Sequence, residues 1–556
     1  MNDFDVCVIG SGAGGGGVAA ALAAAGKRVV VLEKGPWLRD SDFRKDEIGA
    51  SRRSMYSPDR RAQPHVVETY DADEGWQAYP TTDTGWDFWN GTLVGGASNL
   101  MSGFFHRKKP QDFRLLSEYG PIAGANVADW PITYDDLEPW YAQVESLIGV
   151  SGRVPSHGLL DRRSTPAFPQ PPLAEHPLTA WLERAAADLG LTAQPVPRAI
   201  LSQPWAQRGS CSYTGFCAEY GCATAAKASS RVALLHAAVE SGRCEIRPGC
   251  TAQRIATDAQ GRITHVEYRG PTGAIAKVSA GVYIVACQAI ETARLLLLST
   301  GPRHPNGLGN NRGQVGQNLI FSTAAWATAQ LPLASYDEAS RTALRSPVPW
   351  LNRAIADLYE LRDGRGAKAS KGGLLEFMLG HPNFIGNGVA AAFDGDRPVW
   401  GTELIERLQQ RFGGARRVVV EVFADWLPTP LGRVSLDPAV QDAFGLPVAR
   451  VRIDKHPRNK QVADRLLATG VEVLKRMGGR DLYRSSRGAP STNLPAGTCR
   501  MGRDPAASVV DASCRVHEFD NLYIADASTW PTGGSVPPTW TVYANALRIA
   551  HGISGR

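Results

Sequence analysis

Closely spaced glycines near the start of the chain have the pattern of a loop that holds phosphate. Gly10, Gly12 and Gly15 follow a short apolar run, and a stretch of small residues, 18–25, comes next. In such a loop the first glycine permits a tight turn, the second lets the backbone approach a pyrophosphate, and the third lets a helix pack closely on a strand. The free N–H groups and the positive dipole end of that helix then bind the anion. The glycines therefore predict a dinucleotide-binding loop.

An acidic residue stands where a dinucleotide site needs one. Glu33 ends the next apolar run, residues 28–33. Its carboxylate can accept hydrogen bonds from both hydroxyls of an adenosine ribose but would repel a 2′-phosphate, so NADP is disfavoured. A glycine-rich loop in another kind of α/β protein is the alternative interpretation of the glycines alone. Because strand, helix, second strand and Glu33 fall in register, we favour the dinucleotide, and the motif fits FAD at least as well as NAD.

A cluster of three cysteines is the second group that could do chemistry. Cys211, Cys217 and Cys222 lie within twelve residues. Thiolates so spaced on a glycine-containing loop can converge on one metal centre. Zinc is disfavoured because a closed structural zinc site takes four ligands and no histidine lies close by in the sequence. Structural thiols are the alternative interpretation, which we favour.

Buried strands and helices must position these groups. Apolar, β-branched runs predict parallel strands at residues 5–10, 28–33, 281–286 and 521–526. Helices are expected at residues 18–25, 290–298 and 540–553. Apolar and polar residues alternate over 421–438 and 444–453, which indicates antiparallel strands. Residues 336–397 lack a clear period and are expected to be rich in loops.

The composition excludes several classes of protein. With 556 residues, 43% hydrophobic and 21% charged, the chain is an ordinary globular one and neither disordered nor collagen-like. The net charge of +6 comes without a basic run, so no nucleic-acid partner is predicted. Glycines and Lys27-Arg28 interrupt the apolar N-terminal stretch, so neither a membrane span nor a signal peptide is predicted. Nine cysteines, an odd number, favour a reduced, cytoplasmic setting, although export with a partner subunit would leave the same sequence.

Six motifs, in order along the chain, resemble those of the glucose-methanol-choline (GMC) flavin oxidoreductases. They are the N-terminal dinucleotide fold, Gly95-Gly96-Ala-Ser98, Trp130-Pro-x-x-Tyr134, Ile290-Glu-Thr292, Gly497-Thr-Cys-Arg-Met-Gly502 and Asn521-Leu-Tyr-x-x-Asp526. The segments Cys217-Ala-Glu-Tyr-Gly-Cys222 and Ala226-Lys227 are most similar to the bacterial gluconate- and sugar-dehydrogenase branch.

The resemblance implies an α/β fold in which a Rossmann-like FAD-binding domain is discontinuous in sequence. A cap domain built on an antiparallel sheet would hold the substrate over the flavin. The FAD-binding domain would comprise residues 1–130, 222–322 and 488–556, and the cap residues 131–221 and 323–487. The alternating residues of 421–438 and 444–453 suit strands of such a cap.

FAD is the cofactor that the resemblance implies. In this family the position of Asp526 caps the ribityl and pyrophosphate region, and Pro537 lies near the flavin ring. For Asp526, the N-cap of the C-terminal helix is the structural alternative, and the two roles are compatible. The residues expected to hold FAD are Gly10, Gly12, Ala13, Gly14, Gly15, Glu33, Lys34, Gly95, Gly96, Ser98, Asn99, Asp526, Pro537 and Thr539.

The sequence departs from the family at both acid–base positions. GMC enzymes remove the hydroxyl proton with a histidine three residues before the first glycine of the Gly-Thr-Cys-Arg-Met-Gly motif, since an imidazole pKa lies near the working pH. Here that position is Leu494, and the partner position before the last helix is Pro537. A slip of one residue would place Asn493 there, but an amide is no base near neutral pH. Proline at the partner position is a smaller departure than leucine at position 494, because a family member can rely on a single histidine.

Three explanations for the missing catalytic histidine stay open. Another side chain supplies the base, with His381, His456 and His517 the nearest candidates by segment, although each has an ordinary surface or core role as its alternative. In the second, which we favour from the sequence, the substrate is self-activated and needs no strong base. In the third, the chain is a catalytically silent flavoprotein subunit, because losing a general base costs roughly 10²–10⁴-fold in rate.

The resemblance also implies a function. The chain would transfer hydride from a CH–OH group of a small polar, sugar- or polyol-like substrate to flavin N5, and electrons would then pass to oxygen, a quinone or a cytochrome partner. An atypical enzyme of a biosynthetic pathway, oxidising an activated position, is the alternative. Some sugar dehydrogenases of the family bind a [3Fe–4S] cluster through three cysteines in the region of Cys211, Cys217 and Cys222. The usual pattern has a further cysteine where Thr214 stands.

Overall fold

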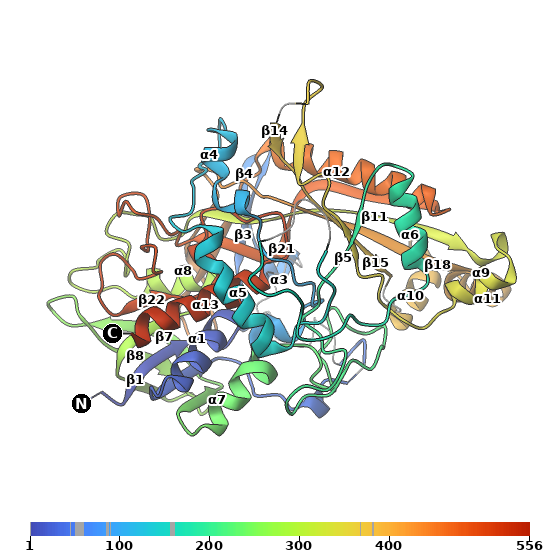
Figure 1. Cartoon of the computed structure of the whole chain (residues 1–556). Coiled ribbons are helices and arrows are strands. Elements are labelled where there is room, and N and C mark those ends of the chain that lie inside the picture. The colour runs from blue at the N-terminus through green and yellow to red at the C-terminus, as the bar shows by residue number, and fades with distance from the viewer. Residues whose placement is uncertain are drawn as a thin grey trace.

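The computed structural model describes residues 2–44, 46–49, 61–84, 88, 91–155, 162–366, 368–380 and 383–555. Within these residues, two large sheets organise the molecule, one with five strands and one with ten. The five-stranded sheet and its helices lie near the two termini in Figure 1, and the long strands of the ten-stranded sheet extend away from them. None of the helices described in these residues has the length and apolar content to cross a membrane.

The five-stranded sheet is parallel where its neighbours pair, in the order β22-β10-β1-β2-β6. Its strands are β1 (Phe4–Ile9), β2 (Val29–Glu33), β6 (Cys244–Pro248), β10 (Ala280–Val285) and β22 (Leu522–Ile524). These are largely buried runs, as expected of a parallel sheet covered on both faces. Strands predicted at 5–10, 28–33, 281–286 and 521–526 are thereby confirmed.

Two helices, α1 (Ala13–Ala24) and α13 (Thr539–Ser554), pack together beside this sheet. An added Cβ at Gly17 would lie 2.9 Å from the Cβ of Ala546, so only a glycine allows this close approach. Helix α1 begins before the predicted residue 18. The glycines of its first turns are poor helix formers, but tertiary packing against α13 overrides that preference.

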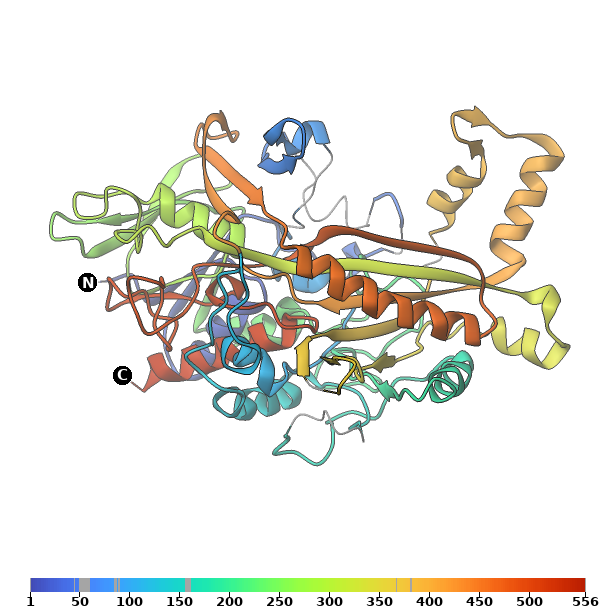
Figure 2. The same cartoon turned by 90° about the horizontal axis from the view of Figure 1, so that it is seen from above.

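The ten-stranded sheet has the order β4-β3-β20-β19-β11-β18-β15-β12-β5, and β21 also pairs with β11. All its described pairs are antiparallel except β20 with β3. The strands are β3 (Val66–Asp71), β4 (Gly75–Pro80), β5 (Ala193–Pro195), β11 (Gln317–Pro332), β12 (Arg353–Ile355), β15 (Gly373–Leu379), β18 (Ala415–Ala424), β19 (Arg433–Gln441), β20 (Pro447–Ile453) and β21 (Arg480–Thr498). Helix α12 (Pro457–Arg476) runs along β11 and β21 in Figure 2.

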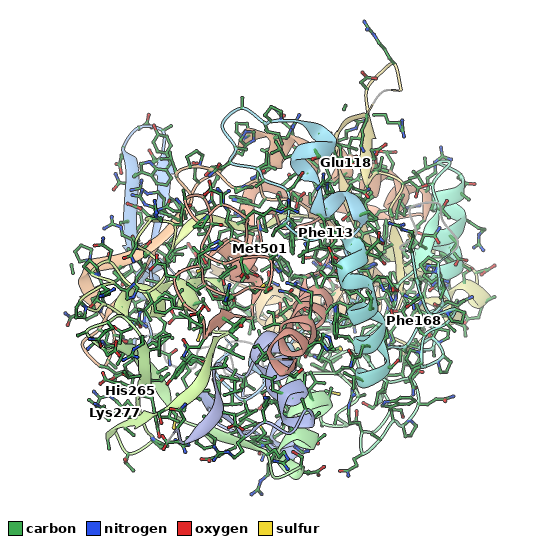
Figure 3. The ribbon with its side chains drawn as sticks, turned by 60° about the vertical axis from the view of Figure 1, so that its left-hand side comes forward. Phe113, Glu118, Phe168, His265, Lys277 and Met501 are labelled. Atoms are coloured by element: carbon green, nitrogen blue, oxygen red, sulfur yellow. The ribbon has the colours of Figure 1, made fainter. Side chains whose placement is uncertain are left out.

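The remaining helices and strands belong to neither of the two large sheets. The helices are α3 (Thr81–Thr84), α4 (Leu115–Tyr119), α5 (Tyr134–Ile148), α6 (Leu178–Ala187), α7 (His236–Glu240), α8 (Ala289–Leu298), α9 (Glu338–Leu344), α10 (Phe384–Ala391) and α11 (Gly401–Gly413), with single turns η1 (Asp40–Asp42), η2 (Gly96–Asn99), η3 (Pro110–Phe113), η4 (Arg231–Leu235), η5 (Leu333–Ser335) and η6 (Ala527–Thr529). The strands are β7 (Thr251–Thr257), β8 (Ile263–Arg269), β9 (Ile275–Val278), β13 (Glu360–Arg362), β14 (Lys368–Lys371), β16 (Phe393–Asp394) and β17 (Arg397–Pro398). Figure 3 shows His265 of β8 and Lys277 of β9, two neighbouring strands of the three-stranded sheet β7-β8-β9.

The stretch 336–397 contains more regular structure than the expected loops. It carries β12 and β15 of the large sheet, and six of the seven residues of β15 are buried. A strand buried on both faces has no alternation of apolar and polar residues, so its period could not be recognised. This strand matters for the site because it pairs directly with β18.

A buried network of charges lies at one side of the large sheet. Lys371 of β14 places its Nζ 2.5 Å from Asp112 Oδ1 and 2.6 Å from Asp425 Oδ2, and Tyr359 donates its hydroxyl to Asp112 Oδ2 at 2.8 Å. Burial alone would raise the pKa of Asp112, but Lys371 and Lys108 bring it below its ordinary value. The ions are therefore held in their charged forms by one another.

Candidate active site

A cavity of about 540 Å³ connects the two sheets. At one end it is lined by residues of the glycine loop after β1 and by Glu33 at the end of β2. At the other end it is lined by side chains of β15 and β18 and by the last residues of β21. Parallel sheets bind ligands beyond the carboxyl ends of their strands, which is where β1 and β2 reach this cavity.

The glycines of the loop divide into two kinds. An added Cβ at Gly14 would lie 1.8 Å from the carbonyl oxygen of Ala525, and one at Gly15 would lie 1.9 Å from that of Gly10, so both positions are closed by protein. Gly10 itself has a φ of +95°. At Gly12, by contrast, an added Cβ would meet nothing within 4 Å. Gly12 thus leaves open the space that a dinucleotide pyrophosphate needs at the N-terminus of α1, and the residues present fit that group.

Glu33 is held rigidly at the cavity wall. Its Oε2 accepts hydrogen bonds from the backbone N–H and the hydroxyl of Ser11 at 3.1 and 2.7 Å, and its Oε1 accepts one from the N–H of Gly35 at 2.9 Å. Burial raises the pKa of Glu33, and these donors oppose the rise. The same hydroxyl of Ser11 accepts from the N–H of Gly95, so Glu33 is tied to the second glycine loop.

Asp526 joins the end of β22 to the neighbouring strand–helix connection. Its Oδ2 accepts hydrogen bonds from the N–H of Gln288 and the hydroxyl of Thr292, at 3.0 and 2.6 Å, and its Oδ1 accepts from the N–H of Ser528 at 2.9 Å. It is the N-cap of the short turn η6 and not of the C-terminal helix, whose N-cap is Pro538. Burial raises the pKa of Asp526, against the effect of these donors.

Most residues expected to hold FAD meet at this cavity. Those that line it are Gly10, Gly12, Ala13, Gly14, Glu33, Lys34, Gly96, Ser98, Asp526, Pro537 and Thr539. Gly15, Gly95 and Asn99 do not line it. Asn99 instead donates its side-chain amide to the carbonyls of Val94 and Gly96 at 3.0 and 2.9 Å, so it holds the loop's shape.

The far end of the cavity contains the two positions where the family places its acid–base pair. Asn493, Leu494 and Pro537 all line it. Leu494 packs against a buried apolar cluster that includes Phe104 and Phe423. Asn493 accepts a hydrogen bond from the hydroxyl of Ser491 at 2.6 Å. Neither Leu494 nor Pro537 offers a proton acceptor to a substrate here.

Two of the three histidines predicted by segment, His456 and His517, are not brought to this end. His456 caps α12 and lies 2.9 Å from the carbonyl oxygen of Ala123, and His517 contacts the hydroxyl of Ser508 at 2.9 Å. Neither belongs to the residues that line the cavity. His381 lies outside the described residues.

A glutamate that sequence reasoning missed does line the cavity. Glu421 lies in β18 and contributes to the wall beside Phe423, and Met378 of β15 lies near it. Burial raises the pKa of Glu421 to about 7, and the carboxylates of Glu376 and Glu219 add to the effect. The available signal was a single acidic residue inside an otherwise apolar run of the β18 sequence.

The three clustered cysteines do not form a metal site in the described part of the chain, where no group of three or more histidine, cysteine, aspartate or glutamate side chains is arranged to hold an ion. Cys211, Cys217 and Cys222 form no disulfide and pack at the edge of an apolar cluster around Ile200 and Trp350. Burial raises the pKa of Cys211, which disfavours the thiolate that a metal requires. Their packing is that of structural thiols.

Comparisons with known proteins find relatives of the whole chain and solved structures with a similar fold. The chain is 30% identical to the 2-methyl-1,2-propanediol dehydrogenase of Mycolicibacterium austroafricanum, over 99% of this chain and 95% of that protein. It is 27% identical to the fructose dehydrogenase large subunit of Gluconobacter japonicus, over 99% of this chain and 97% of that protein. Its fold is similar to the crystal structure of pyridoxine 4-oxidase from Mesorbium loti, with a TM-score of 0.61, 18% identity and 99% of each chain covered.

Family models match both parts of the sequence. The N-terminal model described as GMC oxidoreductase covers residues 15–323, which include the glycine loops and β10. The C-terminal model of the same description covers residues 428–546, which include Asp526 and the end of β21. The protein therefore belongs to the GMC oxidoreductase family, whose members are FAD-dependent oxidoreductases.

Proposed function

We propose that this protein oxidises a CH–OH group of a small polar, sugar- or polyol-like molecule with bound FAD. The observation that carries the proposal is the continuity of the cavity from Gly12 to Leu494, because one end suits the pyrophosphate and the other reaches the family's reaction position. Relatives named a diol dehydrogenase and a fructose dehydrogenase subunit support the substrate class.

Residues of the chain have distinct tasks in this proposal. The backbone at Gly12 and the start of α1 bind the pyrophosphate, and Glu33 receives the ribose hydroxyls of the adenosine. Asp526 fixes the backbone between β22 and η6, where the cofactor's central part would lie. Phe104 and Phe423 exclude water from the reaction end. When bound, the flavin supplies a hydride acceptor.

The division into domains is part of the same proposal. Residues 1–130, 222–322 and 488–556 would form the FAD-binding domain, and the five-stranded sheet, which draws strands from all three segments, supports it. Strands β3 and β4 lie within 1–130 but hydrogen-bond into the ten-stranded sheet, so that segment also reaches the cap side. None of the nine cysteines, all of which lie in the described residues, forms a disulfide, which supports the expected reduced, cytoplasmic setting.

Anaerobic mixing tests the proposed activity. Purified protein should carry one FAD per chain, and at least one member of a panel of sugars, polyols and aryl alcohols should bleach the oxidised flavin without oxygen. The matching deoxy compounds, which lack the CH–OH group, should leave the spectrum unchanged. If no alcohol bleaches the flavin and dithionite does, the silent-subunit alternative replaces this function.

The apolar reaction position favours a second candidate, oxidation of an activated position. Leu494 and Pro537 offer no base, so a hydroxyl that is already acidic would need less help than a plain alcohol. The same panel separates the two candidates, since only activated members would then reduce the flavin. Addition of oxygen, a quinone or a cytochrome to the reduced protein identifies the electron acceptor by the rate at which the flavin spectrum returns.

The cysteine cluster makes a further prediction. We expect purified protein to contain no stoichiometric iron or acid-labile sulfide, and Cys217→Ser to retain the flavin and the activity, because these thiols pack as apolar side chains. Iron analysis and the visible spectrum measure this. About three irons per chain, lost together with sulfide in Cys217→Ser, would instead establish the [3Fe–4S] cluster and a relay to a protein acceptor.

A further inference from the structure

We propose that Glu421 receives the hydroxyl proton of the substrate, in place of the histidine that Leu494 replaces. The inference rests on the proposed function, since it assigns a residue to the oxidation of a CH–OH group. It differs from the three histidines named from the sequence, because Glu421 comes from the cap sheet and lines the cavity itself.

The alternation of side chains along β18 directs Glu421 toward the cavity. Val418, Val420 and Val422 are buried in the core beneath α12, and an added Cβ at Gly470 of that helix would lie 3.0 Å from Val420. Successive side chains of a strand point to opposite faces, so Glu421 must point away from α12. Phe423, two residues on, lines the cavity with it. Glu421 is therefore the acidic member of the cavity face of β18.

The carboxylate of Glu421 has capacity to accept a proton from a ligand. Four of the five other acids that line this cavity are already engaged: Glu33 and Asp526 each accept three hydrogen bonds, and Glu291 and Asp442 pair with Arg294. The fifth, Glu219, is one of the charges that raise the pKa of Glu421. Among the residues that the structure describes, no hydrogen-bond donor contacts the Glu421 side chain, which is only partly buried because it faces the cavity.

A second glutamate sets the proton affinity of the first. Glu376 of β15 lies directly opposite Glu421 in the antiparallel pair, where Cβ atoms are about 4.5–5.5 Å apart. Glu376 is fully buried and hydrogen-bonds His106 through Oε1, while its Oε2 is buried without a partner among the described residues. Two carboxylates this close resist ionising together, so one of them retains a proton more strongly.

The charged groups around Glu421 all raise its pKa. Glu376 faces it from β15 and Glu219 from the loop before Tyr220, and the residue opposite on β11 is the uncharged Trp326. Burial is the largest cause, and together they place the pKa of Glu421 at about 7. A general base is most effective when its pKa lies near the working pH. The pairing of Glu421 with Glu376 thereby provides a proton acceptor with a pKa near neutral, which is what the imidazole of the family's histidine provides.

The step balances with the residues and cofactor already named. The substrate O–H bond breaks and its proton passes to a carboxylate oxygen of Glu421. The electron pair of that bond forms the carbonyl π bond. The electron pair of the C–H bond leaves with its hydrogen as hydride, for which bound flavin is the acceptor. The alcohol is oxidised by two electrons, and no further reactant is required.

Glu421→Gln tests the assignment in the flavin-loaded protein. We expect the rate of flavin reduction by the best alcohol of the panel to fall roughly 10²–10⁴-fold, with flavin content retained. The wild-type rate should decline below about pH 7, where Glu421 becomes protonated, and this limb should be missing from the variant. The variant should fold, because a neutral amide of the same shape removes the repulsion with Glu376. Glu472→Gln, an exposed glutamate of α12, is the matched control and should keep both rate and limb.

An infrared pH titration provides a measurement independent of turnover. A protonated-carboxyl band that disappears between about pH 6 and 8 should be present in wild-type protein and absent from Glu421→Gln. Reduction by Glu421→Gln at the wild-type rate with an unchanged pH limb, or no such band in the wild type, would overturn the assignment. A wild-type flavin that no CH–OH donor reduces would overturn the proposed function instead, a result that the panel reports before any variant is made.

Discussion

Gly12→Leu should fold normally and contain no flavin. An added Cβ at this position would meet no protein atom within 4 Å, and Gly12 has ordinary backbone angles, so we expect the fold to accept the substitution. The same side chain would occupy the space in front of α1 that the pyrophosphate needs. Activity should fall to background because the hydride acceptor is missing. Flavin absorbance per chain measures the cofactor content, and far-ultraviolet circular dichroism measures whether the variant folds.

Two other glycines serve as controls for that experiment. Gly552→Leu also enters open space, but on the last helix and away from the cavity, so it should retain flavin and activity. Gly14→Leu should fail to fold, because its Cβ would lie 1.8 Å from the Ala525 carbonyl oxygen. If Gly12→Leu retained a full complement of flavin, the assignment of this loop to the pyrophosphate would be wrong.

Lys371→Met should destabilise the protein by about 3–5 kcal/mol, a large fraction of the stability of a typical domain. The substitution removes the cation that lies between Asp112 and Asp425, and it leaves the fully buried Asp112 with Lys108 as its remaining cationic neighbour. Removing one member of a buried ion network costs far more than losing a surface ion pair. Urea unfolding of the flavin-loaded protein, followed by tryptophan fluorescence, measures the change.

A neighbouring lysine gives the comparison. Lys368 begins the same strand and pairs with Glu118 and Glu360 where water reaches all three side chains. Lys368→Met should therefore change stability by less than about 1 kcal/mol. Equal effects of the two substitutions would show that the buried network contributes no more than an exposed pair.

The FAD side of the fold could be predicted because its signals are local. The strand, glycine loop and helix that carry Gly12 are contiguous, and each has its own pattern of apolar or small residues. Glu33 follows directly at the end of the next strand, so it could be placed without knowledge of distant pairing. The structure brings Gly12 and Glu33 to one cavity, as the spacing indicates.

The reaction end could not be derived in the same way, because it depends on pairing between distant segments. Leu494 and Pro537 reached the cavity as the family resemblance implied, but Glu421 gains its character from Glu376 across the strand pair β15–β18. Strand β15 has no alternation, so neither its presence nor its register could be read from the sequence. The sequence pointed only to histidines as bases, and the two of them that the structure describes, His456 and His517, lie away from the cavity.

The order of strands in the five-stranded sheet has a consequence for how the protein is made. The phosphate loop is synthesised before β10, the neighbour of β1, and long before β22. At about 5–20 residues per second, β10 follows β1 by roughly 15 s to a minute, and β22 follows by roughly half a minute to two minutes. During translation β1 has an unpaired edge, which is a site for aggregation and chaperone binding. A nascent chain stalled before β22 lacks Asp526 and the strand that pairs with β10, so we expect it not to retain flavin.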